Sequence, residues 1–226
     1  MIIMKRNDLL NKIKSSDYLE SMSPENVKKR AEERRLIEAP FIEDLRRNGY
    51  PEIENASEIL GLRKMDKKLS TLLIKWIPEI SDAQHSQETL VRALALSKSS
   101  FDGKALTELF DSNKSSYLLK WAIANTIASA KVENIEDWLE KKTFAFRLGK
   151  EHEMLVYAIM KYFNPEKASA LLKKLFDTFP LQVSDALSKI GTHSDLVFLE
   201  NKFFNYLGEG KSEIKGALKK LKKKLG

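Results

Sequence analysis

The residue types that most often carry out chemistry are few and scattered in this sequence. The three histidines, His85, His152 and His193, are too far apart to form the closely spaced ligand pairs of a helix-borne metal site. Cysteine is absent, which excludes disulfides, thiolate metal ligands and cysteine nucleophiles. No Gly-x-Ser-x-Gly sequence holds a serine nucleophile, and no glycine-rich loop precedes a helix in a phosphate-binding pattern. The sequence therefore predicts no catalytic residue, no metal site and no cofactor.

A five-residue pattern recurs along most of the chain and indicates how its helices are organised. An apolar residue is followed by two variable positions, then by Ala, then by Leu or Ile. The five copies begin at Leu90, Leu119, Leu155, Val183 and Ile214. Residues at i, i+3 and i+4 lie on one helix face, and the small Ala lets a neighbouring helix approach closely. A recurrence of about 30 residues predicts a stacked-repeat architecture.

A second apolar helix is expected between successive copies, for example at Leu106-x-x-Leu109-Phe110. Each helix pair cannot bury its own apolar face, so neighbouring pairs must stack. From about Lys67 to the end, the five copies and the Ala186–Gly191 segment resemble the HEAT-repeat family of armadillo-type folds. The resemblance implies an all-α fold, a right-handed α-solenoid of HEAT-like helix pairs whose second helices line a concave surface. It says almost nothing about function, because such solenoids host many activities.

Two regions are predicted: a divergent N-terminal helical cap over residues 1–66 and one continuous solenoid over residues 67–226. In the cap, helices are expected at 7–13, from Ser23-Pro24 to about Glu38, and at 41–47, because Pro40 should break or kink the chain. Ser23 and, in the solenoid, Asn164 are expected to be N-cap residues, each followed by Pro at the first helical position. A short helical turn follows at 56–60. In the solenoid, helices are expected at 68–77, 87–98, 103–110, 117–131, 134–141, 151–163, 165–176, 180–190, 196–203 and 212–225. No segment has the period-two pattern of a strand.

The candidate binding residues lie on the second helix of each pair. Relative to the Ala of each copy, positions five and one before it and three after it share one helix flank. This flank combines aromatic, basic and acidic side chains, a mixture that suits an interface. The predicted partner-binding residues are Glu88, Arg92, Tyr117, Trp121, Asn125, Glu153, Tyr157, Lys161, Asp185 and Lys189. The alternative is that Trp121 and Tyr157 fill the seam between adjacent repeats.

The net charge of +7 is compatible with an anionic partner. Much of the excess lies in the last helix, where seven lysines face a single acid, Glu213. These lysines are Lys211, Lys215, Lys219, Lys220, Lys222, Lys223 and Lys224. They have two interpretations: the polar outer face of a terminal capping helix, or a nucleic-acid contact.

One enzyme hypothesis follows from the family resemblance. Some HEAT-like proteins are alkylpurine DNA glycosylases, which grip DNA in the concave groove and carry a Trp followed four residues later by a catalytic Asp. The resemblance places that Trp on Trp121, but Asn125 stands at the position of the acid. An amide cannot stabilise a developing cation or position a water as a carboxylate does.

The sequence therefore favours a non-catalytic scaffold or adaptor that binds a protein or peptide on its concave face. The alternative is a nucleic-acid-binding HEAT-repeat protein of the glycosylase type. The N-terminus becomes charged at Lys5, too early for a signal peptide, and no stretch approaches the roughly 18 apolar residues of a membrane span. We expect a cytoplasmic protein, monomeric and without a membrane partner.

Overall fold

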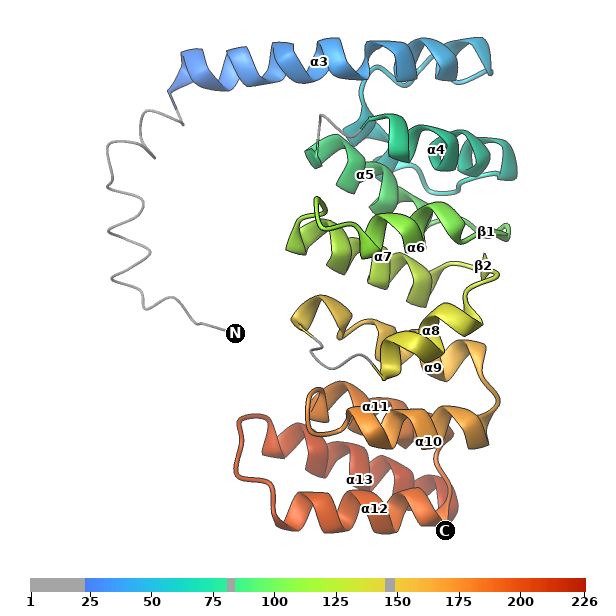
Figure 1. Ribbon diagram of the computed structural model, residues 1–226, viewed down its shortest axis with the longest axis vertical. Helices are drawn as coiled ribbons and strands as arrows, with labels where there is room; N and C mark the ends of the chain where they lie inside the picture. Colours follow the sequence, from blue (N-terminus) through green and yellow to red (C-terminus); the bar gives the residue numbers. More distant parts are fainter. Residues whose placement is uncertain (1–22, 81–83, 145–148) are drawn as a thin grey trace.

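The computed structural model describes residues 23–80, 84–144 and 149–226. Within these ranges the chain is all-α apart from two very short strands, as the sequence predicts, and its helices form an elongated column of stacked pairs (Figure 1). The helix predicted at 7–13 lies outside the described residues. Among the described helices, none is both long and apolar enough to cross a membrane.

The column begins with helix α3 (Pro24–Arg47) and the 3-10 helix η1 (Ala56–Gly61), and continues as helix pairs. The first helices of the pairs are α4 (Lys67–Glu79), α6 (Lys104–Asp111), α8 (Glu136–Thr143), α10 (Pro165–Leu175) and α12 (His193–Phe204). The second helices are α5 (Gln84–Leu94), α7 (Tyr117–Ser129), α9 (Leu155–Tyr162), α11 (Pro180–Ile190) and α13 (Lys211–Leu225). A short 3-10 helix, η2 (Lys150–His152), precedes α9. The second helices pack on one another in order, α5 on α7, α7 on α9, α9 on α11 and α11 on α13.

The repeated alanines lie at equivalent buried positions in these second helices, as predicted. The four alanines Ala93, Ala122, Ala158 and Ala186 have no exposed surface, and Ala217 in the last helix is 5% exposed. Because protein interiors are close-packed, a methyl group at these positions sets how closely adjacent second helices approach.

The apolar core runs along the column and divides at α9. Leu155 and Ala158 belong to the cluster that continues up to α3, whereas Val156 and Ile159 belong to the cluster that continues down to α13. In each of these two sets the residues are three positions apart, so the eight-residue helix presents one face to each cluster.

Short parallel strands join consecutive pairs at one edge of the column. Strand β1 (Phe101–Asp102) follows α5 and pairs with β2 (Val132–Glu133), which follows α7. At Gly103 a Cβ atom would collide with the side chains of Val132 and Ile135, so this close approach requires glycine. Two-residue strands are too short to show alternation, which is why the sequence did not predict them.

Helix α3 is continuous through Pro40, so the predicted break there is wrong. Because Pro40 has no N–H, the backbone carbonyl of Leu36 lacks its usual hydrogen-bond donor in the helix. Leu36 is 68% exposed, so this residue lies at the surface. Beyond Pro40, Phe41 and Leu45 are fully buried against the column, and this packing holds the helix together. Pro78 likewise lies inside α4, which ends at Glu79.

Other helix limits differ from the sequence prediction by a few residues. The start of α5 is at Gln84 and its end at Leu94, instead of 87 and 98, and α12 already begins at His193. The N-cap residues of α3 and α10 were predicted correctly. The Ser23 hydroxyl accepts a hydrogen bond from the Asn26 backbone N–H, and the Asn164 side chain accepts one from Lys167.

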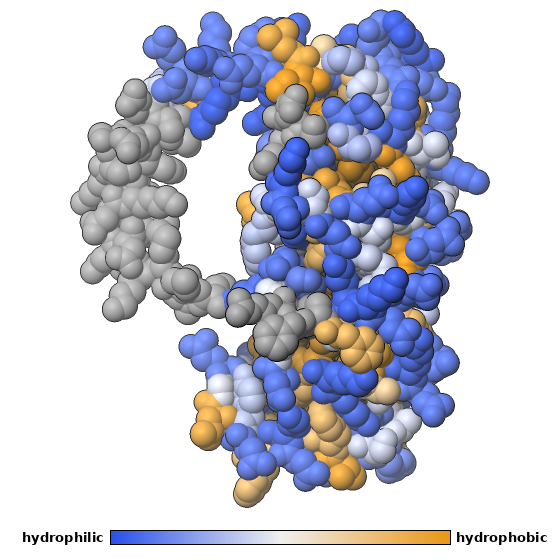
Figure 2. Space-filling view, in the orientation of Figure 1, coloured by the Kyte–Doolittle hydropathy of each residue, from blue (hydrophilic) through white to orange (hydrophobic). Residues whose placement is uncertain are grey.

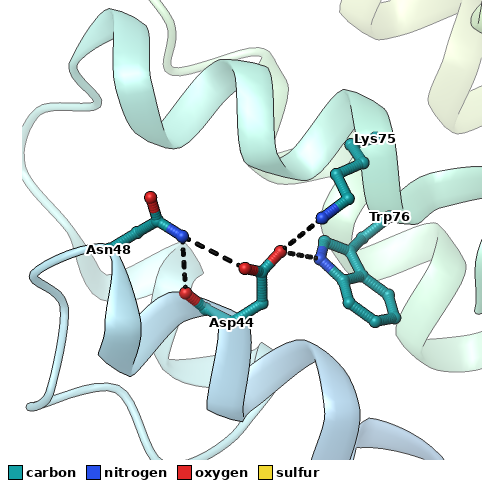
Figure 3. A network of polar contacts seen from close by, with 4 residues as sticks. All are labelled: Asp44, Asn48, Lys75 and Trp76. Atoms are coloured by element: carbon teal, nitrogen blue, oxygen red, sulfur yellow. Dashed lines mark hydrogen bonds and ion pairs between the residues drawn. The ribbon is translucent and has the colours of Figure 1, made fainter.

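Polar contacts tie the C-terminal half of α3 to the first pair. Asp44 accepts hydrogen bonds from the indole Nε1 of Trp76 and from Lys75 Nζ, both at 2.7 Å, and Asn48 donates to the same carboxylate (Figure 3). One turn and a half earlier, the buried Glu38 accepts from Ala56 N at 3.1 Å. The N-terminal half of α3 instead projects beyond the side of the column (Figure 1).

Candidate functional site

The ten predicted residues lie on α5, α7, α9 and α11 and in the turn before α9, and none of them is buried. Exposed side chains belong to Tyr117, Lys161 and Lys189, and the other seven residues are half-buried. We call these ten residues the second-helix flank. Most of them contact a residue of a neighbouring pair, so the flank is a connected surface with defined geometry.

The upper part of the flank is built around Trp121. Arg92 is held by Glu88 on the same helix, with Nε 2.8 Å from Oε1, and its guanidinium lies 5.4 Å from the centre of the Trp121 ring. The indole Nε1 of Trp121 donates to Glu153 Oε1 at 2.8 Å. Trp121 therefore joins α5, α7 and the turn before α9, the seam position that was the alternative interpretation of this residue.

Glu153 carries the connection further down the column. Its second carboxylate oxygen accepts a hydrogen bond from Gln182 Nε2 of α11 at 3.2 Å. A single carboxylate thus links α7 to α11 across the width of α9. Sequence reasoning selected Glu153 but not Gln182, because Gln182 lies four residues before Ala186, outside the three positions used.

The lower part of the flank repeats the combination of acid, cation and aromatic ring. Lys189 Nζ lies 2.8 Å from Asp185 Oδ2, one turn away on α11, and 5.2 Å from the centre of the Tyr157 ring on α9. Burial raises the pKa of Tyr157, and the negative charge of Asp185 raises it further. The phenol is therefore neutral at physiological pH and acts as a packing surface for Lys189.

Lys161 serves the fold by closing the end of a helix. Its ammonium group donates to the backbone carbonyls of Ala128, at 3.2 Å, and Ala130, at the C-terminal end of α7. Lys224 does the same two pairs further on, donating to the carbonyls of Lys189 and Gly191 at the end of α11. A cation at a helix C-terminus satisfies carbonyls that have no partner within the helix. Burial lowers the pKa of Lys161, with a smaller contribution from Lys131.

Tyr117 and Asn125 differ from the other flank residues in the pairing of their polar atoms. Tyr117 is 49% exposed and Asn125 is half-buried, and they lie one turn on either side of Trp121. Within the part of the chain that the structure describes, neither side chain has a hydrogen bond or an ion pair. Both residues therefore flank a tryptophan that Arg92 and Glu153 hold in place, while no described residue pairs with their own polar atoms.

A hollow of about 390 Å³ lies at the lower end of the flank. Its lining combines Tyr157, Gln182 and Asp185 of the flank region with Gly216 and Lys220 of α13. The sequence rule that selected the other flank residues also applies to the fifth copy, where it gives Ser212, Gly216 and Lys220 around Ala217. Extending the rule to this copy would have found the α13 wall of the hollow.

A metal site would need His, Asp and Glu side chains gathered around one ion. Over the described ranges, His, Asp and Glu side chains nowhere gather into a group that could hold a metal ion. His152 is largely enclosed, its ring packs edge-on against Phe110 at 5.1 Å, and burial lowers its pKa. This histidine is a neutral core residue at physiological pH.

No family model, curated protein or solved structure matches this chain. Its function must therefore be inferred from the flank itself, whose aromatic and charged side chains are fixed by contacts between pairs. Such a surface can bind a macromolecule through shape, hydrogen bonds and an exposed aromatic side chain.

Proposed function

We propose that this protein is a non-catalytic scaffold or adaptor, a right-handed α-solenoid of HEAT-like helix pairs that binds another protein on the concave side formed by its second helices. The solenoid part of the proposal is supported by the five buried alanines and by the regular packing of α5, α7, α9, α11 and α13. The binding part rests on the second-helix flank.

The observation that carries the proposal is the setting of Tyr117. Its ring is half exposed at the start of α7, one turn from Trp121, which Glu153 and Arg92 hold in place. An aromatic side chain on a rigid support loses little conformational entropy on binding and contributes a large contact area. Asn125, on the other side of Trp121, offers donors and an acceptor to the same partner.

The experiment is affinity capture with the purified chain, followed by mass spectrometry and a nuclease control. Tyr117→Ala should reduce capture of a specific partner by about tenfold or more without changing the melting temperature, as expected for an interface anchor. Leu118→Ala is the matched control, because Leu118 is 57% exposed and adjacent to Tyr117 in sequence. The rotation of about 100° per helical residue places Leu118 outside the three flank positions. Equal loss of capture by both variants would contradict binding at the flank.

Nucleic-acid binding is the second candidate, and the C-terminal lysines favour it. Lys222 pairs with Glu200, and Lys224 is committed to backbone carbonyls, but Lys215, Lys219 and Lys223 are exposed. These three have no ion pair among the described residues. Their contribution would be weak, insensitive to sequence and steeply reduced by salt. Sequence-specific binding that persists at high salt, or release of an alkylated base, would favour this candidate over protein binding.

A further inference from the structure

A second surface lies at the opposite end of the column, between α3 and the segment around η1. It is a hollow of about 510 Å³, which we call the α3 cleft. Its lining is polar, and arginines are its commonest residue type. The lining residues are Ala31, Arg34, Arg35, Glu38, Arg46, Glu54, Asn55 and Ser57. None of them belongs to the second-helix flank.

The positive charges of the cleft lie at its two ends. Arg34 and Arg35 occupy one helix face together with Ala31 and Glu38, at the i, i+3, i+4 and i+7 spacing. Arg46 also lines the cleft and lies 12 residues after Arg34, which corresponds to about 18 Å along a helix that rises about 1.5 Å per residue. The cleft is therefore elongated, and two groups of guanidinium donors are separated by Glu38.

Among the described residues, Arg35 pairs with Glu32 at 3.9 Å, whereas Arg34 and Arg46 are not neutralised. Glu38 is buried, and its two carboxylate oxygens already accept hydrogen bonds from Ala56 N and, at 2.5 Å, from Ser86 Oγ. Within the described ranges, Arg34 and Arg46 have no carboxylate at ion-pair distance. Arg47, which is not among the residues that line the cleft, pairs with Glu43. Arg34 and Arg46 are thus available to an external anion.

The form of the cleft distinguishes between kinds of anion. Single-stranded nucleic acids are held by aromatic side chains that stack on bases, and none of the described residues that line this cleft is aromatic. Glu38 and Glu54 would oppose a phosphodiester chain, whose negative charge recurs every few ångströms. A carboxylate fits a guanidinium fork through two parallel hydrogen bonds. A distance of about 18 Å corresponds to roughly five residues of extended peptide.

We propose that the α3 cleft binds an extended peptide segment of a partner protein, with two acidic residues about five positions apart that pair with Arg34 and with Arg46. The proposal does not depend on the second-helix flank. The projecting half of α3 gives a second reason to expect an occupant. Residues 24–37 are largely exposed and mostly hydrophilic on the face seen in Figure 2, and a helix of this length is marginal in water without packing.

The experiment uses a labelled eight-residue Ser/Gly peptide with glutamates at positions 2 and 7, measured by fluorescence anisotropy at low salt. Arg34→Gln and Arg46→Gln should each weaken binding by about tenfold, the effect of losing one charge-assisted contact. Arg47→Gln is the matched control, since it removes the same charge one residue away, and it should change affinity less than about twofold. Binding of the peptide should also slow amide hydrogen exchange in residues 24–37.

Three results would overturn the proposal. The first is equal weakening by Arg46→Gln and Arg47→Gln, which would indicate attraction by net charge alone. The second is equal affinity for a peptide with glutamates at positions 2 and 3, which would remove the role of spacing. The third is tighter binding of an oligonucleotide with the same dependence on Arg34 and Arg46, which would assign the cleft to phosphates.

Discussion

Trp121 gives the sharpest test of how the column is held together, because its two contacts can be removed separately. Trp121→Phe keeps an aromatic ring beside Arg92 but removes the indole N–H, which donates a hydrogen bond to Glu153 at 2.8 Å. Trp121→Ala removes the ring and the donor together. Tyr117→Ala, one turn earlier on the same helix, removes an exposed ring and serves as the control.

The expected costs follow from burial and from the hydrogen bond. A tryptophan side chain buries roughly 200 Å² when enclosed; half of that, at about 25 cal/mol per Å², corresponds to about 2.5 kcal/mol. The hydrogen bond to a carboxylate adds about 1 kcal/mol at this half-buried position. We therefore expect Trp121→Phe to cost about 1 kcal/mol and Trp121→Ala about 3.5 kcal/mol. Tyr117→Ala should cost less than about 0.5 kcal/mol.

Thermal unfolding followed by circular dichroism measures these differences. For a chain of this size a loss of about 1 kcal/mol corresponds to roughly 2–4 °C, so Trp121→Ala should lower the melting temperature by about 7–14 °C. Urea titration would confirm that the slope is unchanged and that stability alone has shifted. If Trp121→Ala melts within about 1 °C of the unsubstituted chain, Trp121 does not hold the pairs together, and the inferred role of the Arg92–Trp121–Glu153 contacts is wrong.

Three further predictions concern other parts of the column. Ala122→Leu should overpack the fully buried seam between second helices and cost about 1–3 kcal/mol, read from the urea midpoint; an unchanged midpoint would contradict the repeat alignment. Gly216→Ala should stabilise the fold by about 1 kcal/mol and so raise the melting temperature, because a Cβ there meets no atom within 4 Å and glycine is a poor helix former. A lower melting temperature would refute this. Burial raises the pKa of Asp195, but hydrogen bonds from Lys173, Ser169 and Thr192 outweigh it, so the folded pKa lies below the usual 3.8. The stability that this carboxylate provides is therefore present above about pH 4 and lost as the pH falls through the lower folded pKa, and Asp195→Asn should flatten the acid side of a stability–pH curve.

The sequence was sufficient to predict those features that depend on neighbours along the chain. The Ala-centred copies identified the buried seam because i, i+3 and i+4 spacing defines a helix face without knowledge of other helices. Ser23 and Asn164 were found as caps because the capping hydrogen bond spans only three residues. Pro40 was misjudged because its local penalty is outweighed by the burial of Phe41 and Leu45, which only the packed column provides.

The flank illustrates a different limit. Helix spacing placed Trp121 and Tyr157 on one side of their helices, but the partners of Trp121 are 29 and 32 residues away in sequence. The residues that meet between two packed helices depend on the relative position of the helices along their axes. A single sequence does not specify that relative position. For the same reason the helix-closing role of Lys161 could not be foreseen, since its acceptors lie at the end of the preceding second helix.

The division of the core at α9 has a mechanical consequence. The two apolar clusters share α9, and α8 also contacts α10, so a few helices join the two halves of the column where no single continuous cluster does. Glu153 adds a polar link at this joint, because it accepts hydrogen bonds from Trp121 on one side and from Gln182 on the other. A ligand that competed for the Glu153 carboxylate would remove this link between α7 and α11.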